Sequence, residues 1–129
     1  MAEGREHRLL VRALVGHLQA RHVTVLGADS RGWPRSAAVG QRRPDVYGYY
    51  PAGGAAVAGE AKRGPELWAC RNQLEELAAE LPEHGPRGAG AALVLAVGQD
   101  FLDEAEDFVR TLTSGRTSVT VWTPGAGRA

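Results

Sequence analysis

Two carboxylates and a lysine occur at a spacing that could assemble a hydrolytic site. Asp45 lies in the segment RPDVY (43–47), and Glu60 and Lys62 lie in the segment AGEAKR (58–63). Carboxylate oxygens bind Mg²⁺, which keeps several waters and also binds substrate phosphates. The metal lowers the pKa of a bound water, and a nearby lysine can orient that water or stabilise the charged transition state. The three residues are therefore suited to metal-assisted hydrolysis of a phosphodiester.

A strand-turn-strand unit is expected to bring these residues together. Residues 45–50 (DVYGYY) and 55–62 (AAVAGEAK) are predicted strands, joined by the turn PAGG at 51–54. Successive side chains of a strand point to opposite faces, so Glu60 and Lys62 should emerge on one face. The hairpin then folds Asp45 back beside them. The alternative is an ordinary ion pair between Glu60 and Lys62 on the solvent face of an edge strand, but the order and setting of the motifs favour a site.

The other elements are predicted from hydrophobic periodicity and turn residues. The expected helices span 5–21, 65–81 and 101–112, and the expected further strands span 22–26, 91–97 and 117–123. The run 91–97 (AALVLAV) has no polar alternation, which indicates a strand buried on both faces. The order α-β-β-β-α-β-α-β predicts an α/β protein with a mixed sheet flanked by helices. Residues 1–129 are expected to form a single domain.

The composition is that of a soluble globular domain, with 43% hydrophobic and 23% charged residues. No apolar run approaches the roughly 20 residues that span a bilayer, so no membrane association is expected. The N-terminus MAEGREHRLL lacks the basic-then-apolar order of a secretion signal. Cys70 is the single cysteine, which excludes an internal disulfide framework. A cytoplasmic location is the expectation.

The charges are unevenly distributed along a chain whose net charge is zero. Residues 31–71 hold seven Arg and Lys against three acids, whereas residues 75–107 hold nine acids and one Arg. A basic field around a phosphate site is compatible with overall neutrality. Both runs could equally be solvated faces, and charge alone slightly favours that simpler interpretation.

The motif order P-D, a gap of 14 residues, then E-x-K resembles the PD-(D/E)XK nuclease superfamily. The resemblance implies a restriction-endonuclease-like sheet with an α-β-β-β-α-β core over residues 5–98 and a C-terminal α-β extension. It also implies that Asp45 and Glu60 bind Mg²⁺, with Mn²⁺ as a possible substitute. The backbone carbonyl of Ala61 would be a further metal ligand, and Lys62 would be the catalytic lysine.

Two helix residues match supporting positions of that family. Members often carry a glutamate on the first helix that reaches the site, and Glu6 continues the line of Leu10, Leu14 and Leu18, which would aim it at the protein. An acid in a first helical turn, stabilised by the helix dipole, is an equally good account. Some branches carry a glutamine on the helix after E-x-K, and Gln73 stands near that position. An exposed helix residue is at least as good an account of Gln73.

Six arginines are candidates for phosphate contacts. They are Arg31, Arg35, Arg42, Arg43, Arg63 and Arg71. Those in the loop 27–43 are favoured, because a loop next to Asp45 can close over a nucleic-acid backbone. Trp33 sits among them and could stack on a base, although anchoring the loop is the preferred interpretation. The four histidines show no metal-ligand spacing and are interpreted as surface or partly buried groups.

The function expected from the resemblance is that of a metal-dependent DNA endonuclease. The compact chain most resembles the small Holliday junction resolvases of archaea and phages, which implies a homodimer with two active sites. A restriction, repair or defence nuclease acting on linear DNA or RNA is a second hypothesis. A non-catalytic nuclease-fold subunit that binds nucleic acid is a third, and the intact set of Asp45, Glu60 and Lys62 argues against it.

Overall fold

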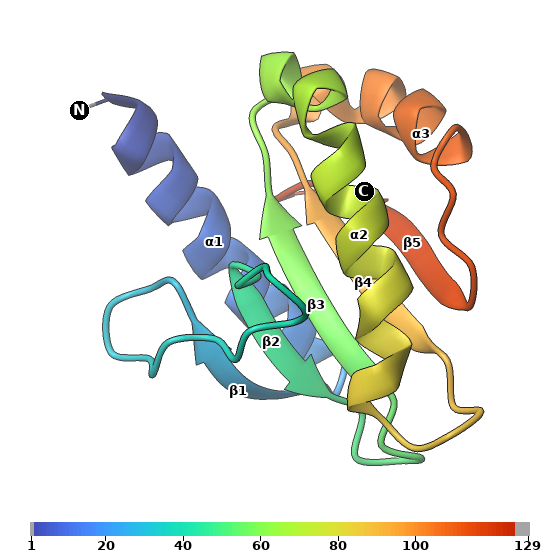
Figure 1. Cartoon of the computed structure of the whole chain (residues 1–129). Coiled ribbons are helices and arrows are strands. Elements are labelled where there is room, and N and C mark those ends of the chain that lie inside the picture. The colour runs from blue at the N-terminus through green and yellow to red at the C-terminus, as the bar shows by residue number, and fades with distance from the viewer. Residues whose placement is uncertain (1, 126–129) are drawn as a thin grey trace.

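A five-stranded mixed sheet forms the centre of the protein (Figure 1), in a computed structural model that describes residues 2–125. The strands are β1 (Thr24–Ala28), β2 (Val46–Tyr49), β3 (Ala56–Ala61), β4 (Ala91–Ala96) and β5 (Thr117–Trp122), side by side in chain order. The first three strands are antiparallel neighbours, whereas β3, β4 and β5 run parallel. The predicted mixed α/β architecture is therefore confirmed.

Three α-helices cover the two faces of this sheet. They are α1 (Ala2–Ala20), α2 (Arg71–Glu80) and α3 (Leu102–Arg110), and short 3-10 turns occur at Gly64–Glu66, Trp68–Cys70, Leu81–His84 and Gln99–Phe101. Helix α1 lies across one face, and α2 and α3 lie on the other (Figure 1). Within residues 2–125, no helix combines the length and the apolar character needed to cross a membrane.

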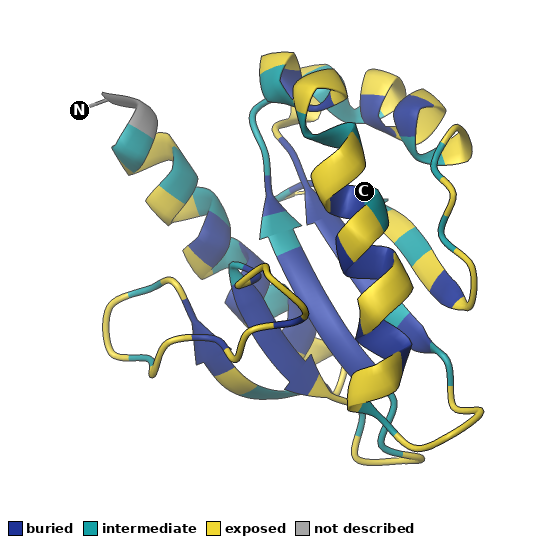
Figure 2. Cartoon of the chain, viewed as in Figure 1, coloured by how far each residue is buried: buried dark blue, intermediate teal, exposed yellow. Residues whose placement is uncertain are grey.

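The side chains of β3 alternate between the two helical layers, as expected for a strand. Val57 and Ala61 belong to the apolar cluster that contains the buried face of α1. Ala56 and Ala58 belong to a second cluster, with Leu77 of α2. The strand is dark blue along most of its length in Figure 2, and Ala56 to Gly59 are all buried. This alternation directs Glu60 away from the face covered by α1.

Strand β4 is buried on both faces, as its continuous apolar sequence predicts. Val94 and Ala96 pack in the cluster around α1, whereas Leu95 packs with residues of α2 and α3. Only Ala92 within β4 is less than fully buried. A strand with helices on both sides has no solvent face, so it needs no polar residues.

Several predicted boundaries differ from the structure, and two of them differ for physical reasons that lie outside the local sequence. The expected helix 65–81 begins as two 3-10 turns around the fully buried Leu67, and regular α-helix starts only at Arg71. Burial of Leu67 thus overrides helical propensity there. The first strand starts at Thr24 and reaches Ala28, later than the expected 22–26, because His22 has a φ of 68° and closes the end of α1.

Replacing Gly48 by alanine is expected to lower the free energy of unfolding by roughly 1–3 kcal/mol. An added Cβ would come within 2.2 Å of the backbone oxygen of Thr24, which cannot move without disturbing β1. Gly16→Ala is the matched control, because nothing lies within 4 Å of its added Cβ and alanine favours a helix. Urea denaturation should show the two substitutions shifting stability in opposite directions. Equal effects of both would contradict this packing of β1 against β2.

Candidate active site

The antiparallel pairing of β2 with β3 places Asp45 beside Glu60. Val46 is opposite Gly59 in the register, so the next facing positions are Asp45 and Glu60. The backbone amide of Asp45 donates a hydrogen bond of 2.7 Å to Oε2 of Glu60. The hairpin expected from the sequence therefore does bring the two acidic residues together.

Two donors hold the Asp45 carboxylate. Its Oδ2 accepts hydrogen bonds from the backbone amide of Ala61, at 2.9 Å, and from Nε2 of His7 on α1, at 3.2 Å. Burial acts to raise the pKa of Asp45, but the hydrogen bonds from His7 and Ala61 outweigh it, so the pKa lies below its ordinary value. The bond to Asp45 in turn raises the pKa of His7. Asp45 is therefore an ionised carboxylate at neutral pH.

Glu60 has the pKa that is shifted further from its ordinary value. Burial, and then the negative charge of Asp45, raise the pKa of Glu60 to about 7. Lys62 opposes this shift, with its Nζ 3.9 Å from Oε1 of Glu60. The side chains of Glu60 and Lys62 are only 15% and 17% exposed, which is less than a solvent-facing ion pair would show. The charged groups of Glu60 and Lys62 are thus largely removed from solvent. A bound cation there would reduce the repulsion between the carboxylates of Asp45 and Glu60.

His7 and Asp29 join Asp45 in a cluster that sequence reasoning missed. One ligand atom from each of the three lies within 4.8 Å of the others, a grouping that could hold a metal ion. The backbone amide of Asp29 donates a 2.7 Å hydrogen bond to the carbonyl of Asp45, because β1 pairs with β2 up to Ala28. The expected strand stopped at residue 26, which hid this neighbour. His7 stands next to Glu6 on α1, and that proximity was the one available signal.

Glu6 and Gln73 do not occupy the positions expected for supporting residues. Glu6 is exposed, and the α1 side chain that bonds Asp45 is His7. Glu6 does line a hollow together with Ala61 and Lys62, so it stands near the site without entering it. Gln73 is exposed on α2, and within residues 2–125 it makes no hydrogen bond or ion pair with the acidic pair. The residues of α1 that share this face are buried at Leu14 and Leu18, but the side chain of Glu6 is exposed.

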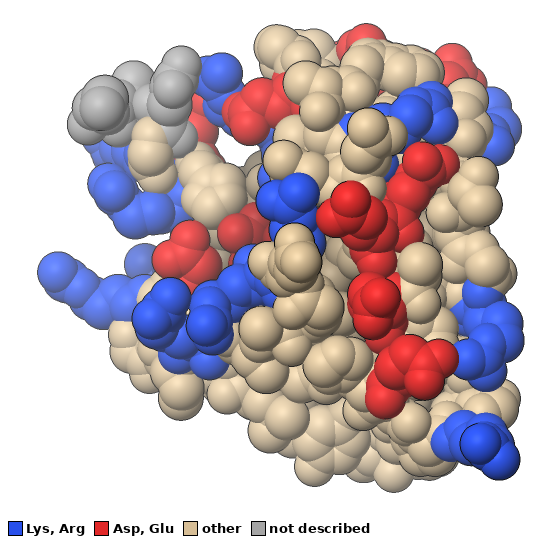
Figure 3. Space-filling view, viewed as in Figure 1, with Lys and Arg blue, Asp and Glu red and all other residues tan. Residues whose placement is uncertain are grey.

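Three of the expected arginines gather around Asp29 and Asp45. The arginine hollow, as it is named here, is lined by Arg8, Ala28, Asp29, Ser30, Arg31, Trp33, Arg35, Ser36, Arg43, Pro44 and Asp45. Arg8 is an addition from α1 that sequence reasoning did not select. Figure 3 shows basic side chains bordering a hollowed region beside the first helix, whereas acidic side chains follow α2. Trp33 packs against the apolar cluster around α1, as expected of a loop anchor.

The other three arginines contact residues outside the arginine hollow. Arg42 pairs with Glu76 at 3.7 Å, and Arg63 pairs with Glu66 at 2.6 Å. The guanidinium of Arg71 donates to Thr111 across to the end of α3 and lies over the rings of Trp68 and Phe108. Arg71 therefore joins α2 to α3. The sequence positions of these arginines did not show whether they contact protein groups or a substrate phosphate.

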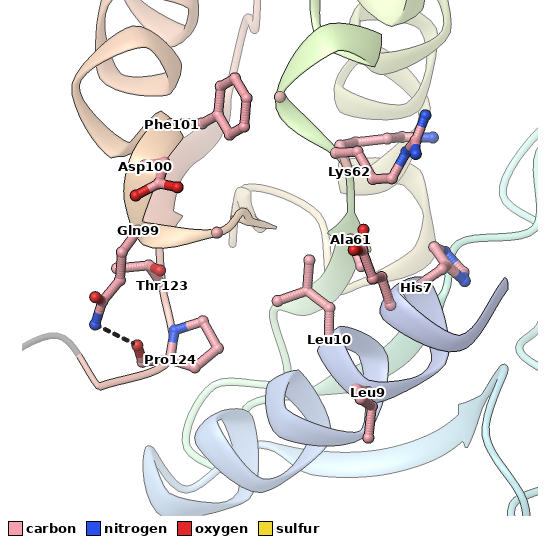
Figure 4. Close-up of a pocket in the computed structure, with 14 residues that line it drawn as sticks. His7, Leu9, Leu10, Ala61, Lys62, Gln99, Asp100, Phe101, Thr123 and Pro124 are labelled. Atoms are coloured by element: carbon pink, nitrogen blue, oxygen red, sulfur yellow. Dashed lines mark hydrogen bonds between the residues drawn. The ribbon is translucent and has the colours of Figure 1, made fainter. Parts of the chain in front are cut away.

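A second hollow, of about 560 Å³, lies on the other side of the acidic pair. The strand-end hollow, as it is named here, is lined by Glu6, His7, Leu9, Leu10, Ala61, Lys62, Arg63, Gly64, Gly98, Gln99, Asp100, Phe101, Thr123 and Pro124. These residues come from α1 and from the segments at the carboxyl ends of the parallel strands β3, β4 and β5. Figure 4 shows Ala61 and Lys62 on one side of the opening and Asp100 and Thr123 on the other, with Leu10 pointing into the space between them and the side chains of His7 and Lys62 directed away from Asp100.

The site thus consists of two close carboxylates and a lysine, with an arginine hollow on one side and a largely apolar hollow on the other. Such a set can hold a divalent cation, position a phosphate and supply a fixed positive charge. Comparisons with models of known protein families, with curated proteins and with solved structures found no match. The chemistry of the site is therefore argued from its own geometry.

Proposed function

We propose that the chain is a divalent-metal-dependent nuclease that hydrolyses phosphodiester bonds in DNA. The observation that carries this proposal is the convergence of Asp45, Glu60 and Lys62 in one partly buried position. Burial, and then repulsion from the Asp45 carboxylate, raise the pKa of Glu60. A buried carboxylate next to a like charge is unfavourable to the fold, and such perturbed groups cluster at functional sites, which supports a functional origin.

The proposed fold family is the restriction-endonuclease-like one. Support comes from the antiparallel run β1-β2-β3, from β4 parallel to β3, and from one helix before the sheet and one between β3 and β4. The acidic pair and the lysine then lie on β3 and at the entrance to β2, where the P-D and E-x-K motifs of that superfamily would stand. Helix α3 and β5 would be the C-terminal extension.

The cation would be held by Asp45 and Glu60, with the backbone carbonyl of Ala61 as the further ligand that the resemblance implies. The residues fit such an ion, because Asp45 is ionised and Glu60 lies beside it as a second oxygen ligand, with its backbone-bonded carboxylate largely removed from water. His7 and Asp29 lie beside Asp45 and could supply further metal ligands. Oxygen ligands suit Mg²⁺, and an imidazole suits transition metals better, so Mn²⁺ is expected to substitute for Mg²⁺. When bound, the cation supplies Lewis acidity and lowers the pKa of water.

The protein side chains would stabilise the transition state, orient the metal ligand and bind the substrate. Lys62 supplies a fixed positive charge within reach of a phosphate held at the carboxylates, and charge placed in a low-dielectric site stabilises a transition state strongly. His7 orients the Asp45 carboxylate through its hydrogen bond. The arginine hollow would bind neighbouring phosphates of the same strand, because guanidinium groups match phosphate geometry.

DNA cleavage in a substrate panel tests this function. The panel contains a labelled four-way junction, linear duplex, single-stranded DNA and RNA, each with Mg²⁺, Mn²⁺ or EDTA. We expect metal-dependent cutting that EDTA abolishes. Paired symmetric nicks in the junction alone would identify a resolvase-like homodimer, whereas cutting of linear substrates would identify a repair, restriction or defence type of nuclease. Binding without any cutting would replace the proposal by a non-catalytic nucleic-acid-binding subunit.

A further inference from the structure

The strand-end hollow differs in chemistry from the arginine hollow, although both lie near Asp45, which lines the arginine hollow. Its walls include the apolar side chains of Leu9, Leu10, Phe101 and Pro124, and Leu9 is 56% exposed at its edge. Isolated exposed leucines are common, but an exposed leucine that continues the apolar wall of a hollow indicates a surface that can bind a ligand. The volume of about 560 Å³ lies in the range of roughly 300–1,000 Å³ that small-molecule sites occupy.

The polar groups of this hollow carry both signs of charge, because Lys62 and Arg63 follow β3 along its wall. Glu6 and Asp100 contribute carboxylates, which repel phosphate oxygens but accept hydrogen bonds from N–H groups. Thr123 also lines the hollow, but its hydroxyl is buried and does not face the open space. Apolar walls and carboxylates together match a flat ring with polar edges.

The strand-end hollow is also continuous with the proposed reaction centre. His7, Ala61 and Lys62 line it, and the first two contact the carboxylate of Asp45 directly. Asp45 itself lines the arginine hollow on the other side. A strand whose phosphates lie in the arginine hollow therefore has the strand-end hollow next to the phosphate at the carboxylates.

We propose, building on the nuclease function above, that the strand-end hollow holds one unstacked nucleobase of the substrate, adjacent to the phosphate that is cut. The ring lies between Leu10 and Pro124 and against Phe101, and its polar edge meets Asp100. A base inside a duplex cannot enter such a hollow without leaving its stack. The substrate class is therefore nucleic acid with an unpaired nucleotide at the cleavage point, such as a single strand, a flap or a branch point.

Single-stranded oligonucleotides with one abasic position, placed at each position in turn, test this inference. Their affinity is measured without divalent cations, and their cleavage is measured with Mg²⁺. Base-to-aromatic contacts are worth roughly 1–3 kcal/mol, so we expect one position at which loss of the base weakens binding about tenfold. The other positions should have small effects.

Gly98→Leu is the variant that connects this loss to the hollow. Gly98 lines the hollow with a φ of −69° and a ψ of 156°, and nothing lies within 4 Å of an added Cβ, so leucine fills the space without straining the fold. We expect Gly98→Leu to weaken binding of the intact strand and to remove its preference over the abasic one. Gly16→Leu is the matched control, since Gly16 is exposed on α1 with open space around it.

The possible results separate this inference from the nuclease proposal. Binding that ignores every abasic position, or an abasic effect that persists unchanged in Gly98→Leu, would overturn the base-binding hollow even if cleavage is observed. A single sensitive position that becomes insensitive in Gly98→Leu supports it. Base-dependent binding with no cleavage under any metal condition would keep the hollow and discard the nuclease.

Discussion

Asp45→Asn and Glu60→Gln are each expected to reduce DNA cleavage by about a hundredfold to a thousandfold, the scale on which loss of one preorganised electrostatic group acts. Each change removes a negative oxygen from the place where the cation would be held, and the amide that replaces it binds Mg²⁺ poorly. Lys62→Met should have an effect of similar size, because Lys62 supplies the nearest fixed positive charge to Glu60. Initial cleavage rates at saturating Mg²⁺ measure all three.

Asp107→Asn is the matched control for these substitutions. The Asp107 side chain is 71% exposed on α3 and pairs with Arg110 at 2.7 Å, away from both hollows. Its cleavage rate should equal that of the wild-type protein. Full activity in the Asp45→Asn and Lys62→Met proteins would show that the reaction takes place elsewhere. Affinity for DNA, measured in EDTA, should change little in Lys62→Met if the lysine acts mainly in the transition state.

Glu60→Gln is expected to raise the free energy of unfolding of the metal-free protein at pH 8 by on the order of 1–3 kcal/mol. The pKa of Glu60 is raised from 4.5 to about 7 by burial and by Asp45, so the folded state binds its proton more tightly than the unfolded chain does. The stabilisation is then complete below pH 4.5 and is lost as the pH rises through 7. A neutral glutamine removes this loss.

Denaturation at pH 5.5 and pH 8 provides the measurement for that second effect. The wild-type protein should lose stability between the two values, and Glu60→Gln should lose less. His7, whose pKa is also raised, contributes a loss of the same sign, so a residual slope is expected in Glu60→Gln. The lowered pKa of Asp45 acts only at more acidic pH. Addition of Mn²⁺ at pH 8 should stabilise the wild-type protein more than Glu60→Gln, and an equal gain in both would argue against Glu60 as a ligand.

A trade between stability and function underlies both results. The substitution that abolishes cleavage is the one expected to stabilise the metal-free fold, because Glu60 is buried next to a like charge. A residue with only a structural role would show the opposite combination. The two measurements on Glu60→Gln therefore distinguish a catalytic site from an incidental ion pair without a known substrate sequence.

The features of this protein that depend on local periodicity could be predicted from the order of its residues. The alternation of side chains in β3 separates Glu60 from Ala61, and the turn after Tyr50 folds Asp45 back toward Glu60. The apolar run at residues 91–97 similarly required a strand covered on both sides. These features follow from the two-residue period of a strand and from turn chemistry, so neighbours in the chain are sufficient to predict them.

The residues that surround the acidic pair could be identified only from the packing of distant segments. His7 reaches Asp45 from 38 positions away because α1 packs across the sheet, and Asp29 arrives because β1 extends beyond its predicted end. Arg71 hydrogen-bonds to Thr111 at the end of α3, whereas Arg43 lies beside Asp45 in the arginine hollow. Such neighbours are set by how helices dock and strands register, and these depend on apolar contacts between distant segments. No local pattern of residue types carries that information.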